Sequence, residues 1–156
     1  MRQLIDAAAA ELAAAGVASP RVDAEVLAAH AAGSQRGRLA FVEPDAGFAE
    51  RFRHLIAQRA RRIPLQHLTG TAAFGLVTVQ VGPGVFIPRP ETEALLEWAL
   101  AQPLPRDSLI VDLCTGSGAL AVALATQWPG ARVIAVDDSE EALAYARRNV
   151  AGTAVE

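Results

Sequence analysis

Residues 109–118 read LIVDLCTGSG, an apolar run that leads into a glycine-containing turn, and a second apolar run, VIAV at 133–136, ends in Asp137. A strand, a Gly-containing turn, a helix and a second strand that ends in an acid about 20 residues on make up the first half of an adenosine-binding α/β site. The glycines allow the backbone to approach a ligand closely. The sequence therefore predicts a nucleoside-containing cofactor, with Asp137 accepting hydrogen bonds from its ribose hydroxyls.

Two observations bear on which cofactor binds. Residues 116–121, GSGALA, fit the dinucleotide fingerprint G-x-G-x-x-A, which by itself favours NAD or FAD. Asp112, however, lies at the carboxyl end of the predicted strand, two residues before the turn. A carboxylate there would repel a pyrophosphate, whereas it suits the ammonium and sulfonium charges of S-adenosylmethionine. The charge at this position favours S-adenosylmethionine.

Three separate motifs are more specific than the glycine pattern. They are IPLQHLTG at 63–70, FIPRPETE at 86–93 and DLCTGSG at 112–118. In order and spacing the chain closely resembles the protein glutamine N5-methyltransferases that modify peptide chain release factors, more loosely near its amino terminus. The resemblance implies a transferase for protein methylation in translation termination, with S-adenosylmethionine as cofactor and a release factor as protein partner. It also implies that the 88–93 loop borders the cofactor pocket, although an interdomain hinge is an equal alternative for that loop.

The candidate cofactor-binding residues follow from both lines of reasoning. Structural alternatives remain open for them: helix capping by the two acids and ordinary turn geometry for the rest. The three histidines lie on separate predicted elements, so no metal site is expected. The candidates are Asp112, Cys114, Thr115, Gly116, Ser117, Gly118 and Asp137 and, through the resemblance, Arg89 and Thr92.

The chain departs from the family pattern in two places. The family usually has Gly where this chain has Cys114, and we expect Cys114 to adopt a negative φ because a side chain is strained at positive φ. The family's catalytic Asn-Pro-Pro-Tyr motif, which holds the substrate amide, does not occur, since Asn149 is the only Asn and Val150 follows it. We therefore expect no catalytic residue in these 156 residues and no activity of this chain alone.

Hydrophobic periodicity predicts an α/β fold with three parts. Helices over 2–15, 20–32, 34–41 and 44–62 form a small helical bundle in a substrate-docking domain, 1–70. A β-hairpin linker, 71–88, turns at 82–84 between a strand at 73–81 and one at 85–87. Residues 89–156 form the first part of a Rossmann-like methyltransferase domain, with helices over 91–101, 117–127 and 139–150 and strands at 109–113 and 132–137.

A doubly wound sheet needs more strands than these two. We therefore expect the chain to be the amino-terminal portion of a longer protein, with an incomplete domain whose apolar helix faces are uncovered. Those faces carry Leu95, Leu96, Leu120, Val122, Leu124 and Leu143.

Composition narrows the partners and the compartment. The net charge is −3 and all 14 basic residues are Arg, which gives no footprint for direct nucleic-acid binding. The five arginines at 51, 53, 59, 61 and 62 are interpreted as a solvated helix face rather than an RNA-binding patch. The sequence shows no signal peptide and no apolar run long enough to span a membrane. Its single cysteine favours the cytoplasm as the compartment.

Two other functions stay open at this stage. One is a fragment of an NAD-dependent oxidoreductase, which would leave Asp112 and the 87–93 loop without explanation. The other is a non-enzymatic helical interaction module fused to a degenerate nucleotide fold.

Overall fold

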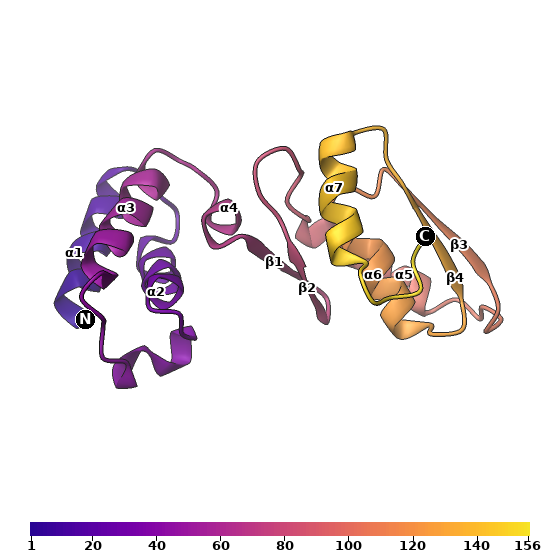
Figure 1. The fold of residues 1–156 in the computed structure, drawn as a ribbon, viewed down its shortest axis with the longest axis horizontal. Helices are drawn as coiled ribbons and strands as arrows, with labels where there is room; N and C mark the ends of the chain where they lie inside the picture. Colours follow the sequence, from indigo (N-terminus) through magenta and orange to yellow (C-terminus); the bar gives the residue numbers. More distant parts are fainter. The chain divides into compact units, whose positions relative to one another are not determined.

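The computed structural model describes all 156 residues, which form two compact units, Met1–Thr69 and Gly70–Glu156. The first unit is helical and the second contains every strand (Figure 1). No helix is long and apolar enough to span a membrane.

The first unit contains four α-helices and a 3-10 helix. They are α1 (Arg2–Ala14), α2 (Pro20–Ala31), η1 (Arg36–Phe41), α3 (Phe48–Ala60) and α4 (Leu65–Thr69). The predicted helix over 44–62 was wrong at its start, because the Gly47 N–H bonds the Asp45 side chain at 2.9 Å in a turn before α3 begins. The predicted third helix begins two residues late and is a 3-10 helix. Periodicity missed α4, which is too short to show one.

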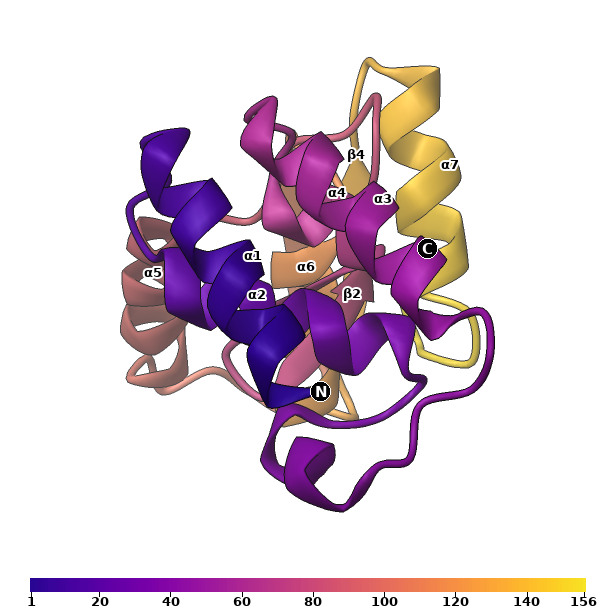
Figure 2. The ribbon, with the colours of Figure 1, turned by 90° about the vertical axis from the view of Figure 1, so that its left-hand side faces the viewer.

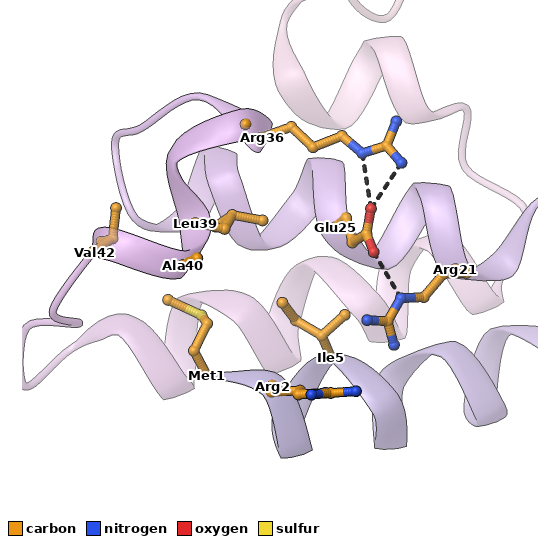
Figure 3. A pocket seen from close by; sticks show the side chains of 10 residues that line it. Met1, Arg2, Ile5, Arg21, Glu25, Arg36, Leu39, Ala40 and Val42 are labelled. Atoms are coloured by element: carbon orange, nitrogen blue, oxygen red, sulfur yellow. Dashed lines mark hydrogen bonds and ion pairs between the residues drawn. The ribbon is translucent and has the colours of Figure 1, made fainter.

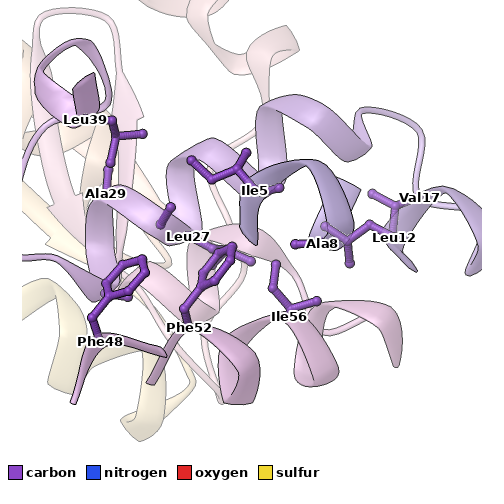
Figure 4. Close-up of a cluster of buried hydrophobic side chains, with 13 residues drawn as sticks. Ile5, Ala8, Leu12, Val17, Leu27, Ala29, Leu39, Phe48, Phe52 and Ile56 are labelled. Carbon is purple, nitrogen blue, oxygen red and sulfur yellow. The ribbon is translucent and has the colours of Figure 1, made fainter. Parts of the chain in front are cut away.

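The core of this unit lies between α1, α2 and α3, as Figure 4 shows. Leu12, Leu27 and Phe48 are among its most completely buried side chains, and the Phe48 and Phe52 rings stack with centroids 5.5 Å apart. The helical spacing of Val22, Val26 and Ala29 predicts that these α2 residues face the core, which is confirmed for Ala29 and wrong for Val22. Val22 is 40% exposed, whereas Leu27 is buried.

An ion pair explains why α2 is rotated away from the predicted face. Asp23 is buried on α2, and its carboxylate accepts a hydrogen bond from Arg59 Nε of α3 at 2.7 Å. Arg59 also donates to the Ile63 carbonyl at 2.9 Å. Because a buried carboxylate needs such a partner, Asp23 and the residues beside it face inward.

The prediction of a solvated arginine face was wrong for Arg59, whose side chain is only 18% exposed, whereas the other four arginines are exposed. Besides Arg59, Arg51 donates to the Ala31 carbonyl at the end of α2, at 2.9 Å from Nη2. Arg62 donates to the Gly16 carbonyl just beyond α1. These carbonyls lie at helix ends, where no intrahelical partner remains. Arg51, Arg59 and Arg62 therefore connect α3 and the residues after it to the other helices of the bundle.

The second unit begins with an antiparallel hairpin of β1 (Thr71–Phe74) and β2 (Val77–Gln80). The prediction that the hairpin turns at 82–84 was wrong: the chain does turn there, with the Val85 N–H donating to the Gly82 carbonyl at 3.3 Å, but this turn does not join the two strands. Phe74 pairs with Val77, so the turn is the two-residue Gly75–Leu76 loop, where Gly75 has a φ of 53°. Residues 85–87 form no strand. The alternating run was interpreted as one strand although it contains both strands and their turn.

The two remaining strands are β3 (Leu109–Leu113) and β4 (Arg132–Val136), which pair in parallel with Leu109 opposite Arg132. Their helices are α5 (Pro90–Leu100), α6 (Ala119–Gln127) and α7 (Glu140–Asn149). Figure 1 shows all three on one side of the strands. Val155 adds a parallel bridge beside Val133. The predicted strand–helix–strand–helix order is confirmed.

The expectation of uncovered helix faces was wrong for Leu96, Val122 and Leu124, which are buried, and is confirmed for Leu95, which is 49% exposed. Leu96 and Leu124 are covered because Phe74 and Val79 of the hairpin pack into the same cluster. Further apolar surface is exposed on β3, on the side of the sheet that carries no helix. Leu109, Val111 and Leu113 are exposed there by 59%, 48% and 70%.

The buried ion pair of the helical unit gives a stability prediction. Arg59→Ala should lower the free energy of unfolding by about 3 kcal/mol, because it leaves the buried Asp23 carboxylate uncompensated. The matched control is Arg53→Ala, since Arg53 is exposed and donates only to Ala49 of its own helix, at 3.1 Å. Urea denaturation measures both, and equal losses in the two variants would contradict the role assigned to Arg59.

Candidate functional site

The glycine turn joins the carboxyl end of β3 to the start of α6. Its backbone is tied to the neighbouring strand, since the Thr115 N–H donates to the Val136 carbonyl at 2.9 Å. It also closes on itself, with the Gly118 N–H donating to the Thr115 carbonyl at 2.9 Å. The turn thus lies at the edge of the parallel sheet where ligands bind in open α/β folds.

A cavity of about 200 Å³ opens beside this turn. Its walls come from the end of β3, the turn, Phe74 of β1 and the loop that leads into α5. Small-molecule pockets usually measure about 300–1,000 Å³, so the cavity can enclose only part of a nucleoside cofactor. It is lined by seven of the predicted site residues: Asp112, Cys114, Thr115, Gly116, Ser117, Arg89 and Thr92. Gly118 and Asp137 do not line it.

Asp112 provides the buried charge of the cavity. Its exposed fraction is 8%, and its Oδ2 accepts a hydrogen bond from the Thr115 hydroxyl at 2.6 Å. Burial raises the pKa of Asp112 above its usual range, and the hydrogen bonds from the Thr115 hydroxyl and the Ala121 N–H offset part of that rise. A cation held in the cavity would offset the cost of keeping this carboxylate ionised.

Asp137 connects two elements through the backbone. Its Oδ2 accepts the Gly116 N–H at 2.8 Å, and its Oδ1 accepts the Ser139 N–H at 3.0 Å. These bonds, that from Ser139 first, lower the pKa of Asp137. Asp137 therefore does contribute to the start of α7, which is one of its alternative roles. Ser139 caps the same helix, because its Oγ accepts the Ala142 N–H at 3.2 Å. A carboxylate has about four acceptor positions, so ribose hydroxyls remain possible partners, and that role stays a prediction.

The expected negative φ at Cys114 was wrong. Cys114 is exposed and has a φ of 61°, in the left-handed region. Its neighbours explain the conformation, because the chain must leave β3 at Leu113 and present the Thr115 N–H to β4. The turn is not distorted in its hydrogen bonds, contrary to what we expect of a side chain at that φ. The strain is therefore confined to one residue.

The second wall of the cavity starts at Phe86. This ring is 66% exposed, and the guanidinium carbon of Arg89 lies 4.8 Å from its centroid. Arg89 is also the residue just before α5, and its carbonyl accepts the Thr92 N–H at 3.0 Å. Phe86 and Phe74 were not among the predicted site residues. Phe86 lies within the 86–93 motif, and that position was a usable signal in the sequence, whereas nothing in the sequence places Phe74 here.

A larger cavity, of about 890 Å³, lies in the helical unit (Figure 3). The Glu25 carboxylate lies between two guanidinium groups there, 2.7 Å from Arg21 Nε and 2.8 Å from Arg36 Nη2. Three arginines, Arg2, Arg21 and Arg36, line this cavity against the single carboxylate of Glu25, so its lining is net positive and does not suit a cationic ligand. No predicted site residue lines it. This cavity is the larger of the two, but the smaller one at the β3 turn has the residues expected of a site for a nucleoside-containing cofactor. No group of three or more His, Cys, Asp or Glu side chains is arranged to hold a metal ion.

Comparison with known proteins gives two family models and a set of relatives. The model "PrmC N-terminal domain" matches residues 3–70, and "Methyltransferase domain" matches residues 110–156. A release factor glutamine methyltransferase of Mycolicibacterium smegmatis is 69% identical over the whole chain, which covers 56% of that protein. Proteins of the same name are 62% identical in Mycobacterium tuberculosis, over 100% of this chain and 53% of theirs, and 42% identical in Deinococcus radiodurans, over 97% and 56%.

The chain is therefore similar over its whole length to release factor glutamine methyltransferases. It spans about half the length of the curated relatives that it matches. The predicted family and the predicted fold class, a helical part followed by the start of a methyltransferase domain, are therefore confirmed.

The strained turn predicts the effect of removing the side chain. Cys114→Gly should raise the free energy of unfolding by about 1 kcal/mol, because Gly adopts a positive φ without steric cost. Cys114→Ala is the matched control, since it removes the thiol but keeps the strain. Urea midpoints measure both. A gain shared by the two variants would assign the effect to the thiol.

The burial of Asp112 predicts opposite pH trends for stability and for binding. Because its folded pKa is raised, the folded chain binds more protons, and stability falls as pH rises from the unfolded value of about 4 through the raised one. Affinity for a cationic ligand should change the other way and fall as pH drops through that raised pKa. Asp112→Asn should remove both trends; trends that survive in this variant would assign them to another group. Thermal melts and calorimetric titrations from pH 4 to neutrality measure them.

Proposed function

We propose that this chain binds S-adenosylmethionine at the β3 turn, as part of an enzyme that methylates the glutamine side-chain amide nitrogen of a peptide chain release factor. One observation carries the proposal: the buried Asp112 carboxylate and the glycine turn meet in a single cavity at the carboxyl end of a parallel sheet. The 69% identity to a release factor glutamine methyltransferase supports the reaction and the substrate.

The residues present fit this cofactor. No atom lies within 4 Å of where a Cβ on Gly116 would be, so the backbone there is open to a ligand. Asp112 is buried beside it, and its hydrogen-bond partners, the Thr115 hydroxyl and the Ala121 N–H, are both neutral, which favours a positively charged group. A dinucleotide would instead bring a pyrophosphate toward this carboxylate.

Each site residue then has a definable task. When bound, S-adenosylmethionine supplies a methyl group on a sulfonium centre. Asp112 would balance positive charge on the cofactor, and the 115–117 backbone would contact it closely. Asp137 would accept hydrogen bonds from its ribose hydroxyls, while Arg89 and Thr92 supply polar groups on the opposite wall.

The acceptor needs more than these residues. An amide nitrogen is a poor nucleophile because its lone pair is delocalised, so the NH2 group must be hydrogen-bonded and held in line with the methyl group. The family resemblance assigns this task to an Asn-Pro-Pro-Tyr motif that the 156 residues do not contain. We therefore assign no acceptor-binding residue. The helical unit is proposed to dock the release factor, in the cytoplasm and without direct contact to nucleic acid.

Titration distinguishes the cofactors. In a form of this protein with the relatives' full length, we expect calorimetry to show binding of S-adenosylmethionine and none of NAD. Asp137→Ala should weaken this binding by about 1–3 kcal/mol, through lost ribose contacts and a loosened turn. The control is Asp138→Ala, one residue further along. Binding of NAD alone would overturn the proposed cofactor, and an unchanged dissociation constant would remove Asp137 from the site.

A radiolabelled-methyl assay tests the reaction. The full-length form should transfer the label to a release factor, and replacement of the acceptor glutamine should abolish labelling. Residues 1–156 assayed alone should transfer no detectable label even with excess cofactor, because nothing positions the amide. Comparable turnover by residues 1–156 would show that the acceptor site lies within them.

A further inference from the structure

Asn149, the last residue of α7, makes three hydrogen bonds to backbone groups of two separate segments. Its Oδ1 accepts the Gln80 N–H at 2.7 Å, and its Nδ2 donates to the Gln80 carbonyl at 2.9 Å. The same Nδ2 donates to the Ser117 carbonyl at 2.8 Å. One amide thus holds the end of β2 and the glycine turn together.

Each of these backbone groups depends on Asn149 for a reason of its own. Gln80 lies opposite Thr71 in the hairpin and directs its N–H and carbonyl away from β1, where no further strand pairs with them. Ser117 is buried, and its carbonyl precedes the first helical bond of α6, which the Gly118 carbonyl accepts from the Val122 N–H. A buried backbone carbonyl without a partner is costly, so the bond from Asn149 matters most at Ser117. Gln80 is exposed, and there the Asn149 amide takes the place of water.

The two segments held by Asn149 carry opposite walls of the cofactor cavity. Ser117 belongs to the turn wall, and the hairpin carries Phe74 and continues into the loop of Phe86 and Arg89. Asn149 does not line the cavity itself. Two further contacts join α7 to the same two segments. The Tyr145 hydroxyl donates to the Pro83 carbonyl at 3.3 Å, just after the hairpin, and a Cβ on Gly118 in the turn would lie 3.4 Å from Ala146.

We propose that Asn149 is a positioning residue for cofactor binding, which sets the separation of the two cavity walls without touching the ligand. The identity of the ligand rests on the proposed function, but the hydrogen bonds of Asn149 to Gln80 and Ser117 do not depend on it. Supporting groups of this kind often decide whether a site is held tightly enough to bind.

Three variants of the full-length form test the role. Asn149→Ala removes all three bonds. Asn149→Asp keeps the acceptor for the Gln80 N–H but loses both donated bonds, including the one to Ser117. Ala144→Gly is the matched control, because Ala144 is an exposed residue in the middle of α7, so Gly there weakens the helix without altering either contact.

The readouts are the dissociation constant for S-adenosylmethionine, measured well below every melting temperature, and amide hydrogen exchange without ligand. Asn149→Ala and Asn149→Asp should weaken binding by about 5- to 30-fold, the effect of one or two lost hydrogen bonds, and should speed exchange at Gly116 and Gly118. Asn149→Asp should leave the Gln80 amide protected. Ala144→Gly should lower the melting temperature and leave the dissociation constant unchanged.

Two results would overturn the proposal. One is an unchanged dissociation constant in both Asn149 variants; the other is an equal loss in Ala144→Gly, which would reduce the effect to global stability. If the unsubstituted protein does not bind S-adenosylmethionine, the proposed function fails and amide exchange decides: faster exchange at Gly116 and Gly118 in Asn149→Ala upholds the positioning contact, and unchanged exchange refutes it.

Discussion

The carboxylate of Asp137 makes the contact on which the site depends. It lies at the end of β4 and accepts one backbone N–H from the β3 turn, at Gly116, and one from the start of α7, at Ser139. The turn is therefore fixed to the second strand rather than only to the strand that it follows. Because α7 begins at the same carboxylate, the helix is directed so that its last residue, Asn149, reaches Ser117 and Gln80. One end of α7 aligns the turn and the other end aligns the hairpin with it.

The site stores unfavourable energy in two places, and both line the same cavity. Cys114 occupies a left-handed conformation that costs a non-glycine residue about 1–2 kcal/mol. Asp112 is a carboxylate withdrawn from water with a single side-chain partner. The ion pair of Asp23 with Arg59, in the helical unit, shows how the same chain partners a buried carboxylate where no ligand is expected. The contrast supports the proposal that Asp112 balances the charge of a cationic ligand.

Local signals in the sequence predict much of this structure. Apolar runs bounded by glycines and acids predict the β3 strand, its glycine turn and the acid after β4. Most of the site residues predicted from these signals line the cavity. The misplaced hairpin turn has a local cause, since Gly75 lies inside an alternating run that was interpreted as one strand. Other features depend on contacts between distant residues: the face of α2 depends on Arg59, 36 positions from Asp23, and Asn149 bonds a residue 69 positions away. No pattern within a single helix or strand encodes such partners.

We expect a methyl donor to bind at the β3 turn rather than in the larger cavity of the helical unit. Amide chemical-shift mapping of the ¹⁵N-labelled protein during titration with S-adenosylmethionine distinguishes the two. The saturable shifts should concentrate at residues 114–118 and at Arg89 and Thr92, with the helical unit unchanged. Shifts confined to the residues around Arg21 and Arg36, or a turn that does not respond at saturating cofactor, would contradict it.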